Sequence, residues 1–589
     1  MSDNVPTMET DVLIIGTGPA GAAAACALAT YGISNMVINK YGFTCRTPRA
    51  HITNQRTMEL LRDLGLEREV EEQGVPHELM GENTYCTSVA GDELGRIKAW
   101  GTHPLRKADY DLASPTKIHD LPQNLMEPIV IRAAAHRGAK VRFNTEYLGL
   151  EQDADGVTAR LRDGLTGQEY DVRCKYLIGA DGANSKVLQD VDLPLEGKMG
   201  LSGSMNIVFE ADLSRYVEHR PSILYWVIQP GSNVGGLGIG VVRMVRPWWK
   251  WLAIWGFEVD QGPPDLTEEL ATSIVHNLVG DHDIPVKIDS TSTWTVNDTY
   301  ATEVMRGRVF CVGDAIHRHP PTNALGSNTS MQDSYNLAWK LALVIKGQAA
   351  PSLLETYNTE RAPVAKQIVK RANKSLGDFP PILGALGLLG AKDPAEMRNN
   401  MAALRDNTPE AAERRAALQH AIDATEYIYN AHGVELNQRY TSAAVVPDGT
   451  TDPGYSRDEE LYYEATTWPG AHMPHVWLLD NGRQISTLDL CGKGRFALLT
   501  GTGGEAWRDA AKATESAFGV DIAVHVIGHG RQLQDPYGDF ARTRGTTETG
   551  AILVRPDLHV CWRANAVSDS STAELKAALG QLLGRQTAA

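Results

Sequence analysis

The sequence predicts an α/β protein built from three kinds of region. A strand–turn–helix–strand pattern lies near the N-terminus, a β-rich and tryptophan-rich segment spans residues 191–298, and strands alternate with helices over residues 446–589. Alternating strands and helices are typical of sheets covered by helices, whereas strands without helical spacing indicate a separate sheet. At 589 residues the chain exceeds the size of one hydrophobic core, so several domains are expected.

A glycine-rich turn follows the first apolar segment. Val12–Ile15 has the composition of a buried parallel strand, and the turn G-T-G-P-A-G occupies residues 16–21. A helix is expected over residues 22–29, followed by a second apolar run, Met36–Ile38. A G-x-G-x-x-G turn in this context predicts a Rossmann-like dinucleotide site, although a purely structural turn is the alternative.

Each residue of this turn has an expected role. Gly16 allows the tight bend, Gly18 lets a pyrophosphate approach the backbone, and Gly21 lets the helix pack on the strand. Pro19 and Ala20 lie within the turn, and the helix that follows has unpaired N–H groups and a partial positive charge that attract phosphate. The turn is therefore expected to bind the phosphates of a dinucleotide.

The end of the second strand departs from this pattern. Dinucleotide sites commonly place an acidic side chain there to bind a ribose, but this chain has Asn39 and Lys40. An asparagine carbonyl can accept a hydroxyl hydrogen bond without the help of a charge. Both residues are therefore candidates for binding the cofactor.

Two later strands end in a turn that combines glycine with aspartate. The apolar run Tyr176–Gly179 leads to Asp181-Gly182, and the run Val309–Val312 leads to Gly313-Asp314. Two prolines at positions 320 and 321 and an amphipathic helix follow the second turn. A stiff loop that opens a helix presents backbone N–H groups, so it is suited to face a planar cofactor ring.

Composition excludes several classes of protein. The net charge of −16 argues against nucleic acid or an anionic membrane as the main partner. Seven cysteines are scattered without a C-x-x-C pair, and no apolar run reaches the length of a membrane span. His317 and His319 lack a third ligand at a suitable spacing, so no metal site is expected. The polar start is unlike a secretory signal, and a cytoplasmic protein is expected.

The three glycine turns, in this order, resemble the FAD-dependent single-component aromatic hydroxylases. This group includes p-hydroxybenzoate hydroxylase and phenol hydroxylase. The segments R-A-H-I-T-N-Q-R-T-M-E, L-P-Q-N, Y-L-I-G-A-D-G-A-N-S and G-D-A-I-H-R-H-P-P-T-N extend the likeness to the phenol hydroxylase branch over essentially the whole chain. Two departures are Ala324, where glycine is usual, and Lys186, where arginine is common.

The resemblance implies a role for individual residues. The turn at 16–21 would bind the ADP part of FAD, and Asp314 would hold ribityl or ribose hydroxyls. Arg49 and Gln123 match cofactor positions, although Arg49 could equally be a solvated arginine from its position alone. The other residues that match cofactor motifs are Asp181, Gly182, Gly313, Pro321, Gly326 and Asn328.

The reaction implied is ortho-hydroxylation of a phenol or chlorophenol to a catechol. NADPH, or NADH, would reduce FAD, and oxygen would reach the ring through a flavin C4a-hydroperoxide. His51 is the candidate base because phenol hydroxylase carries an acidic residue at its position, and Tyr225 is the second candidate. Packing is the alternative role for His51.

Other functions remain open at this stage. The substrate could be another phenolic or a polyketide-type aromatic, and a non-catalytic FAD-fold binding protein would share the first glycine motif. A flavin-dependent halogenase would need a W-x-W-x-I-P loop, which this sequence lacks. The Gly313-Asp314 turn with its prolines favours an enzyme, and a homo-oligomer, either dimer or tetramer, is expected.

The expected domains are interlaced along the chain. The FAD-binding Rossmann-like domain would comprise residues 1–190, with some insertions of the substrate domain, and 299–375. The β-rich substrate domain would occupy 191–298, a helical connection 376–445, and a thioredoxin-like α/β domain 446–589.

Overall fold

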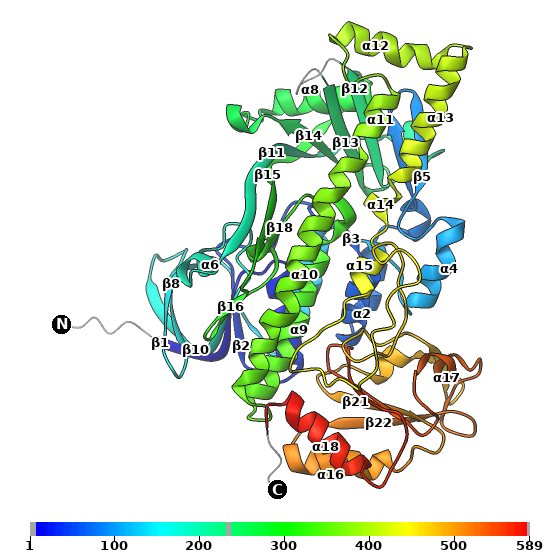
Figure 1. Ribbon diagram of the computed structural model, residues 1–589. Coiled ribbons are helices and arrows are strands. Elements are labelled where there is room, and N and C mark those ends of the chain that lie inside the picture. The colour runs from blue at the N-terminus through cyan, green and yellow to red at the C-terminus, as the bar shows by residue number, and fades with distance from the viewer. Residues whose placement is uncertain (1–6, 231–236, 586–589) are drawn as a thin grey trace, which may run out of the picture.

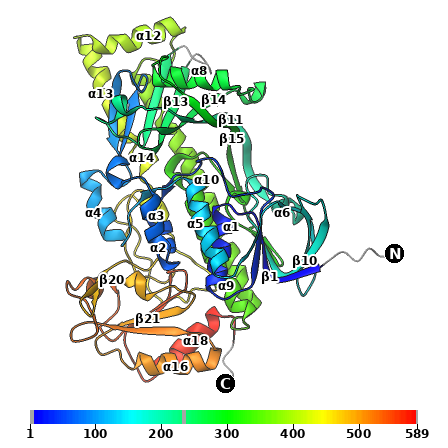
Figure 2. The ribbon, with the colours of Figure 1, turned by 180° about the vertical axis from the view of Figure 1, so that it is seen from behind.

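The computed structural model describes residues 7–230 and 237–585, and it contains three large sheets surrounded by helices (Figure 1). The sheet near the N-terminus and the β-rich sheet are joined by long strands, and the C-terminal sheet packs below the first (Figure 2). A two-stranded pair, β3 (Ile52–Thr53) and β6 (His119–Asp120), lies between the first two sheets.

The first sheet is mostly parallel. Its order is β16 (Met305–Arg306), β17 (Val309–Cys311), β10 (Glu169–Gly179), β1 (Thr7–Ile15), β2 (Asn35–Ile38) and β7 (Lys140–Arg142), with β8 (Thr145–Gln152) and β9 (Val157–Asp163) alongside β10. Helices α1 (Pro19–Thr30), α5 (Gln123–His136) and α9 (Gly326–Ile345) pack together on it. Burial on both faces explains why β1 ends in four consecutive apolar residues.

The second sheet is built from three separate stretches of chain. Its order is β18 (His317–Arg318), β15 (Lys287–Ala301), β11 (Leu195–Glu210), β14 (Lys250–Phe257), β13 (Leu237–Arg246), β12 (Leu224–Pro230), β4 (Glu82–Cys86) and β5 (Glu93–Lys98). Because β4 and β5 come from between elements of the first domain, the two domains are interlaced. The expected domain boundaries and insertions stay a prediction.

Helices connect the sheets. The connecting helices are α10 (Glu355–Lys374), α11 (Pro380–Ala385), α12 (Pro394–Ala402), α13 (Pro409–Ala424), α14 (Glu426–Tyr429) and α15 (His432–Leu436). The remaining helices are α2 (Gln55–Asp63), α3 (Glu67–Gln73), α4 (Pro104–Ala113), α6 (Lys186–Asp190), α7 (Ser214–Val217) and α8 (Glu268–Val279). In Figure 1, α10 runs from the first sheet towards the second, and α12 and α13 lie at the far end of the second sheet.

The C-terminal region is a small α/β domain. Its sheet has the order β20 (Arg483–Ser486), β19 (Trp477–Asp480), β23 (Leu533–Gln534), β22 (Ile522–Ile527), β21 (Phe496–Gly501), β24 (Ala551–Val554) and β25 (Val560–Ala564). Helices α16 (Trp507–Phe518) and α18 (Ser571–Leu582) pack together below this sheet, and α17 (Asp539–Thr543) lies at its side. All seven cysteines of the chain are free thiols.

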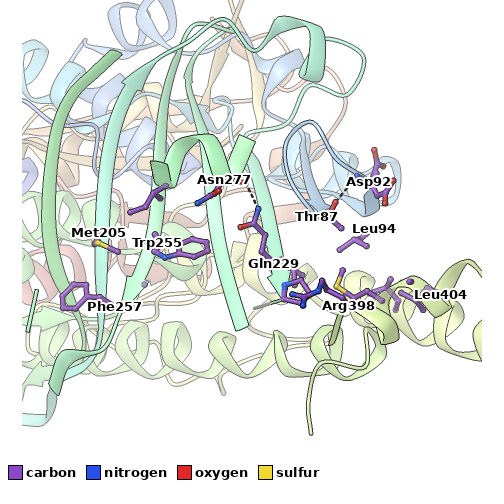
Figure 3. A pocket seen from close by; sticks show the side chains of 18 of the residues that line it. Thr87, Asp92, Leu94, Met205, Gln229, Trp255, Phe257, Asn277, Arg398 and Leu404 are labelled. Atoms are coloured by element: carbon purple, nitrogen blue, oxygen red, sulfur yellow. Dashed lines mark hydrogen bonds between the residues drawn. The ribbon is translucent and has the colours of Figure 1, made fainter. Parts of the chain in front are cut away.

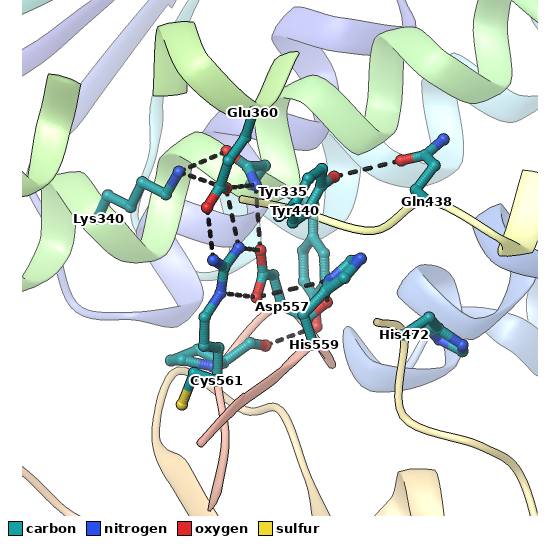
Figure 4. A network of polar contacts seen from close by, with 12 residues as sticks. Tyr335, Lys340, Glu360, Gln438, Tyr440, His472, Asp557, His559 and Cys561 are labelled. Atoms are coloured by element: carbon teal, nitrogen blue, oxygen red, sulfur yellow. Dashed lines mark hydrogen bonds and ion pairs between the residues drawn. The ribbon is translucent and has the colours of Figure 1, made fainter. Parts of the chain in front are cut away.

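A buried cluster of charges, which we call the interface cluster, joins the C-terminal domain to α9 and α10 (Figure 4). Lys340 of α9 lies 2.8 Å from Glu360 of α10, and the guanidinium of Arg555 lies 2.6 Å from the same carboxylate. Arg555 also pairs with Asp557 at 2.5 Å. All four side chains are almost completely buried, so the two positive and two negative charges balance in a region without water contact.

Two negative findings concern the described residues only. In that part of the chain, no helix combines the length and the apolar character needed to cross a membrane. Within residues 7–230 and 237–585, no three histidine, cysteine, aspartate or glutamate side chains are grouped so as to hold a metal ion.

Candidate active site

The three glycine turns meet at one edge of the first sheet. Ile15 at the end of β1 pairs with Gly179 of β10, and Gly179 pairs with Cys311 of β17. Because the three strands are parallel neighbours, the turns that follow them lie side by side. The carboxyl edge of such a sheet is where open α/β folds bind their ligands.

The glycines of the first turn differ in the space around them. A Cβ on Gly16 would lie 2.2 Å from the carbonyl oxygen of Ala180, and one on Gly21 would lie 1.9 Å from the carbonyl oxygen of Gly16. A Cβ on Gly18 would meet only the Glu127 carboxylate, at 4.0 Å. Gly16 and Gly21 are therefore needed for close packing, whereas Gly18 leaves the backbone open to a ligand.

The same turn begins helix α1. Gly18 is its N-cap, Pro19 is its first residue, and no side chain caps it. The first N–H groups of a helix lack intrahelical partners, and they carry the positive end of the helix dipole. Open space at Gly18 together with an uncapped helix fits the pyrophosphate of a dinucleotide.

Gly313 and Asp314 lie next to this helix. A Cβ on Gly313 would lie 3.1 Å from the Cβ of Ala20. The Gly313 N–H donates to the carboxylate of Asp333 at 3.0 Å, and the buried Arg361 holds that carboxylate. The side chain of Asp314 is exposed, and its carboxylate forms no hydrogen bond or ion pair with the described residues. Asp314 is thus free to bind hydroxyl groups of a ligand.

Asp181 and Asn39 are both occupied by local contacts. Asp181 accepts hydrogen bonds from the Ser185 hydroxyl and from the N–H groups of Lys186 and Val187, so it caps α6. Gly182 next to it has a φ of +82°, which favours glycine. The Asn39 amide donates to Thr17 at 2.6 Å, and it therefore ties the glycine turn to the following loop. For both, a contact to a cofactor stays a prediction.

Lys40 and Arg49 point their charges outward. The Lys40 ammonium lies 5.1 Å from the ring centre of Tyr41, and both Lys40 and Arg49 are exposed. Gln123 at the start of α5 donates to Glu127 at 2.5 Å, and the N–H of Cys45 donates to the same carboxylate at 2.6 Å. Burial raises the pKa of Glu127, against the effect of these donors and of Arg49. Gln123 and Arg49 therefore both act on Glu127, the carboxylate that borders the open space at Gly18.

The loop after the prolines is clamped to the segment that contains His51. The Asn328 amide donates to the carbonyls of Ile52 and Ala324 at 2.8 and 2.7 Å, and its oxygen accepts from the Asn54 N–H at 3.0 Å. The side chain of Asn328 is thereby used within the protein, so any contact with a cofactor would come from its backbone. Pro321 and Gly326 border this loop.

Ala324 in this loop adopts a left-handed backbone conformation. Its φ is +54°, a value that favours glycine. This geometry explains why glycine is usual at this position in the family that the sequence resembles. The departure noted in the sequence therefore places alanine in a backbone conformation that favours glycine.

His51 belongs to a buried group of three side chains, which we call the site cluster. His51 Nδ1 lies 3.3 Å from Asp120 Oδ1, and Arg243 Nη2 lies 3.0 Å from Asp120 Oδ2. Their exposed fractions are 5%, 0% and 8%. Burial and the charge of Arg243 lower the pKa of His51 to about 4, against the opposing effect of Asp120 and of the Pro48 carbonyl. The imidazole is therefore neutral near pH 7 and can accept a proton.

Tyr225, the second candidate base, is buried and hydrogen-bonded within the second sheet. Its hydroxyl donates to the Arg220 carbonyl at 2.9 Å and accepts from the Ser222 N–H at 3.1 Å. Its side chain is completely buried in the core of the second sheet, and burial raises its pKa above the usual value. These contacts favour a structural role for Tyr225 at the start of β12, and its role as a base stays a prediction.

A large cavity lies elsewhere, in the second sheet (Figure 3). It has a volume of about 1460 Å³ and is bounded by the ends of β12 and β14 and by α8, α12 and α13. Trp255 and Phe257 supply apolar surface, and Arg398 lies on the opposite wall. Among the described lining residues, none belongs to the glycine turns or to the site cluster.

Comparisons with known proteins decide the family. The chain matches the FAD binding domain family over residues 9–372 and the C-terminal domain family of aromatic-ring hydroxylases over residues 466–586. The chain belongs to the FAD-dependent aromatic-ring hydroxylases. The expected fold class and the expected family are thereby confirmed.

Individual relatives of the hydroxylase cover its whole length. It is 64% identical to 2,4-dichlorophenol 6-monooxygenase of Delftia acidovorans, over 99% of this chain and 100% of that protein. It is 51% identical to phenol 2-monooxygenase of Pseudomonas sp. (strain EST1001), over 96% of this chain and 92% of that protein. The crystal structure of the flavin-dependent monooxygenase PieE in complex with FAD and substrate matches with a TM-score of 0.94 and 45% identity, covering 98% of this chain and 100% of that chain.

Sequence reasoning missed several site residues of the hydroxylase. Asp120 and Arg243 carry single charges inside otherwise apolar runs, I-H-D-L and V-V-R-M-V. An isolated charge in a buried strand is the signal that could have identified them, because such a charge needs a partner. Glu127 and Asp333 lie on helices, and their only local signal is a charge on a buried helix face.

Proposed function

We propose that the hydroxylase converts chlorinated phenols to catechols by ortho-hydroxylation, using NADPH and O2. In this reaction the phenol, NADPH, a proton and O2 give the catechol, NADP+ and water. Bound FAD, once reduced, supplies the activated oxygen atom that is transferred to the ring. The high identity to 2,4-dichlorophenol 6-monooxygenase supports this substrate class, and NADH is the alternative reductant.

The single observation that carries the proposal is the position of His51. Asn328 ties the next residue, Ile52, to the loop that opens α9, and Arg243 reaches the site cluster from the second sheet. A neutral, buried imidazole therefore lies where the two sheets meet. A base at this junction can take the proton of a phenol, and a phenolate is a better nucleophile than a phenol.

The cofactor contacts form part of the same proposal. Gly16, Gly18, Ala20 and Gly21 would receive the pyrophosphate at the N-terminus of α1, and Asp314 would bind hydroxyls of the cofactor chain. Arg49 and Gln123 would lie at the edge of the same site. The first N–H groups of α9, beginning at Gly326, would face the flavin ring.

The proposal is tested by the coupling of reductant to product. Purified enzyme is given NADPH or NADH with 2,4-dichlorophenol, phenol or a polycyclic phenol, and catechol, oxygen uptake and hydrogen peroxide are measured. We expect one catechol per NADPH with dichlorophenol. NADPH oxidation that yields only hydrogen peroxide with simple phenols, but product with the polycyclic phenol, would assign the enzyme to polyketide-type aromatics. Light scattering on the same preparation tests the expected dimer or tetramer.

The base is tested by His51→Asn. Chlorine substituents acidify a phenol, so the variant should lose more rate with phenol than with 2,4-dichlorophenol. General-base catalysis is worth about 10²–10⁴-fold, and the loss should shrink as pH rises because more phenolate is then present in solution. Equal loss with both substrates at every pH would instead identify His51 as a packing residue.

A further inference from the structure

The site cluster combines residues from three distant segments, and its geometry is fixed by the backbone. Ile52 pairs with Asp120 in the β3–β6 ladder, and the Leu121 N–H donates to the His51 carbonyl at 2.8 Å. These contacts hold His51 and Asp120 on adjacent strands. Arg243 comes from β13 of the second sheet, so the cluster forms only when the two sheets are in contact.

The charges of the site cluster are balanced, but some of its polar atoms have no hydrogen-bond partner among the described residues. Asp120 carries one negative charge, which Arg243 neutralises, and burial of the carboxylate is tolerable for that reason. Neither ring nitrogen of His51 forms a hydrogen bond with the described residues, although the side chain is almost fully buried; Nδ1 faces the Asp120 carboxylate at 3.3 Å, whereas Nε2 has no ion-pair partner among them. Buried polar atoms usually have partners, so Nε2 is available to a ligand.

We propose that Asp120 is a positioning residue for the base of this hydroxylase. The inference rests on the proposed function. Asp120 holds the Nδ1–H side of the His51 ring and so leaves Nε2 as the acceptor for the substrate hydroxyl. Arg243 neutralises the carboxylate without contacting the imidazole through a hydrogen bond. A carboxylate behind a histidine also stabilises the imidazolium that forms when the proton arrives.

The proton step is balanced within the site. The O–H bond of the phenol breaks, its electron pair stays on the phenolate oxygen, and an Nε2–H bond forms on His51. The ring carbon that receives oxygen later loses its hydrogen as a proton to water, and the imidazolium returns its proton to the oxygen of the product that was the phenolate, so that His51 is neutral again. No further oxidant or reductant is needed for this transfer.

Charges around the pair set its response to pH. Arg243 and Arg246 both act on Asp120, and Arg243 also acts on His51. Burial alone would raise the pKa of Asp120, but Arg243 and His51 lower it below its usual value. The carboxylate therefore stays ionised near neutral pH, while the ring beside it is neutral.

The proposal is tested with a double-mutant cycle on the flavin-loaded enzyme. Asp120→Asn, His51→Asn and the double variant are compared by kcat/KM with phenol and with 2,4-dichlorophenol. If Asp120 acts through His51, Asp120→Asn lowers kcat/KM for phenol by on the order of 10²-fold, less for dichlorophenol, and adds little once His51 is gone. Losses that multiply in the double variant would overturn the proposal.

A spectroscopic readout does not depend on turnover. A nitrophenol absorbs differently as phenol and as phenolate, so titration of the bound dye reports its ionisation in the site. Asp120→Asn should raise the pH at which the bound dye ionises, and Asp120→Glu should restore it partly. An unchanged titration in Asp120→Asn would show that the carboxylate does not act on the base.

Glu59→Gln provides the matched control. Glu59 is a buried carboxylate 2.9 Å from His472, but this pair lies outside the site. Its loss should lower stability without altering the ratio of the two phenol substrates. If Asp120→Asn fails to fold, the dye titration of His51→Asn decides whether the imidazole ionises the phenol at all. Wild-type enzyme that neither binds the dye nor hydroxylates any phenol would overturn the proposed function together with this inference.

Discussion

The interface cluster and the site cluster are both buried and both balanced in charge, but they differ in how many of their donors and acceptors have hydrogen-bond partners. Glu360 accepts from Lys340, Arg555, Asn336 and Ser442, and every charged group of the interface cluster has partners. In the site cluster, both ring nitrogens of His51, one oxygen of Asp120 and one nitrogen of Arg243 lack a hydrogen bond with the described residues.

This difference indicates a structural role for the interface cluster and a ligand-binding role for the site cluster. A buried network whose donors and acceptors are all paired stabilises one arrangement of the chain, and it has no free donor or acceptor with which to bind a ligand. A cluster with unused donors and acceptors is costly to keep empty, so its unpaired groups are available to a ligand. Gly18 is the backbone equivalent of such an open position, because the chain leaves the space above it unfilled.

The largest effect is expected at this open backbone position. Gly18→Val should give folded but colourless protein, since the added side chain would occupy the space expected for the pyrophosphate. The backbone φ of −64° suits valine, so the fold should remain. Flavin absorbance per chain and circular dichroism measure the two effects.

A control for this variant is Gly149→Val, which also has open space around its Cβ but lies in β8, away from the turns. It should keep its flavin. Full flavin content in Gly18→Val would refute the assignment of the glycine turn.

The interface cluster should respond in the opposite way. Arg555→Met leaves Glu360 and Asp557 buried without their main partner, and breaking a buried pair costs about 3–5 kcal/mol. The free energy of unfolding in urea should fall by that amount, while folded enzyme keeps its ratio of activity on the two phenols. Arg68→Met, which breaks a solvent-exposed pair with Glu72, should change the free energy of unfolding far less than Arg555→Met does. If Arg555→Met changed the ratio of the activities on the two phenols, the interface cluster would also act on the reaction, and the proposed difference between the two clusters would be wrong.

The smallest effect concerns acid. The pKa of His51 is about 4 in the folded protein and 6.5 as a free side chain. Between about pH 6.5 and pH 4, His51 therefore binds a proton in the unfolded state but stays neutral in the folded state. Stability attributable to His51 is therefore full above pH 6.5 and is lost as pH falls towards 4. Between about pH 7 and about pH 5, wild type should lose about 2 kcal/mol more than His51→Asn, measured by urea unfolding. Identical losses would show that the ring is not held neutral by the fold.

The glycine turns were predictable because their chemistry is local. Gly16, Gly18 and Gly21 follow one strand and open one helix, so spacing alone indicates the site. The site cluster was only partly predictable: family resemblance pointed to His51, but its partners are 69 and 192 positions away and meet it only through β3–β6 pairing and sheet contact. Tyr225 illustrates the converse limit, because its residue type suits a base while its hydrogen bonds are already used.

The C-terminal domain reaches back to helices near the site. Arg56 of α2 donates to the carbonyl of Asp557, which lies 501 positions later in the chain, and Tyr335 of α9 donates to the carbonyl of Pro556. During synthesis, these donors therefore emerge from the ribosome long before their acceptors. Helices α2 and α9 can reach their final packing only after nearly the whole chain has been made, so the candidate active site is completed late in the folding of each molecule.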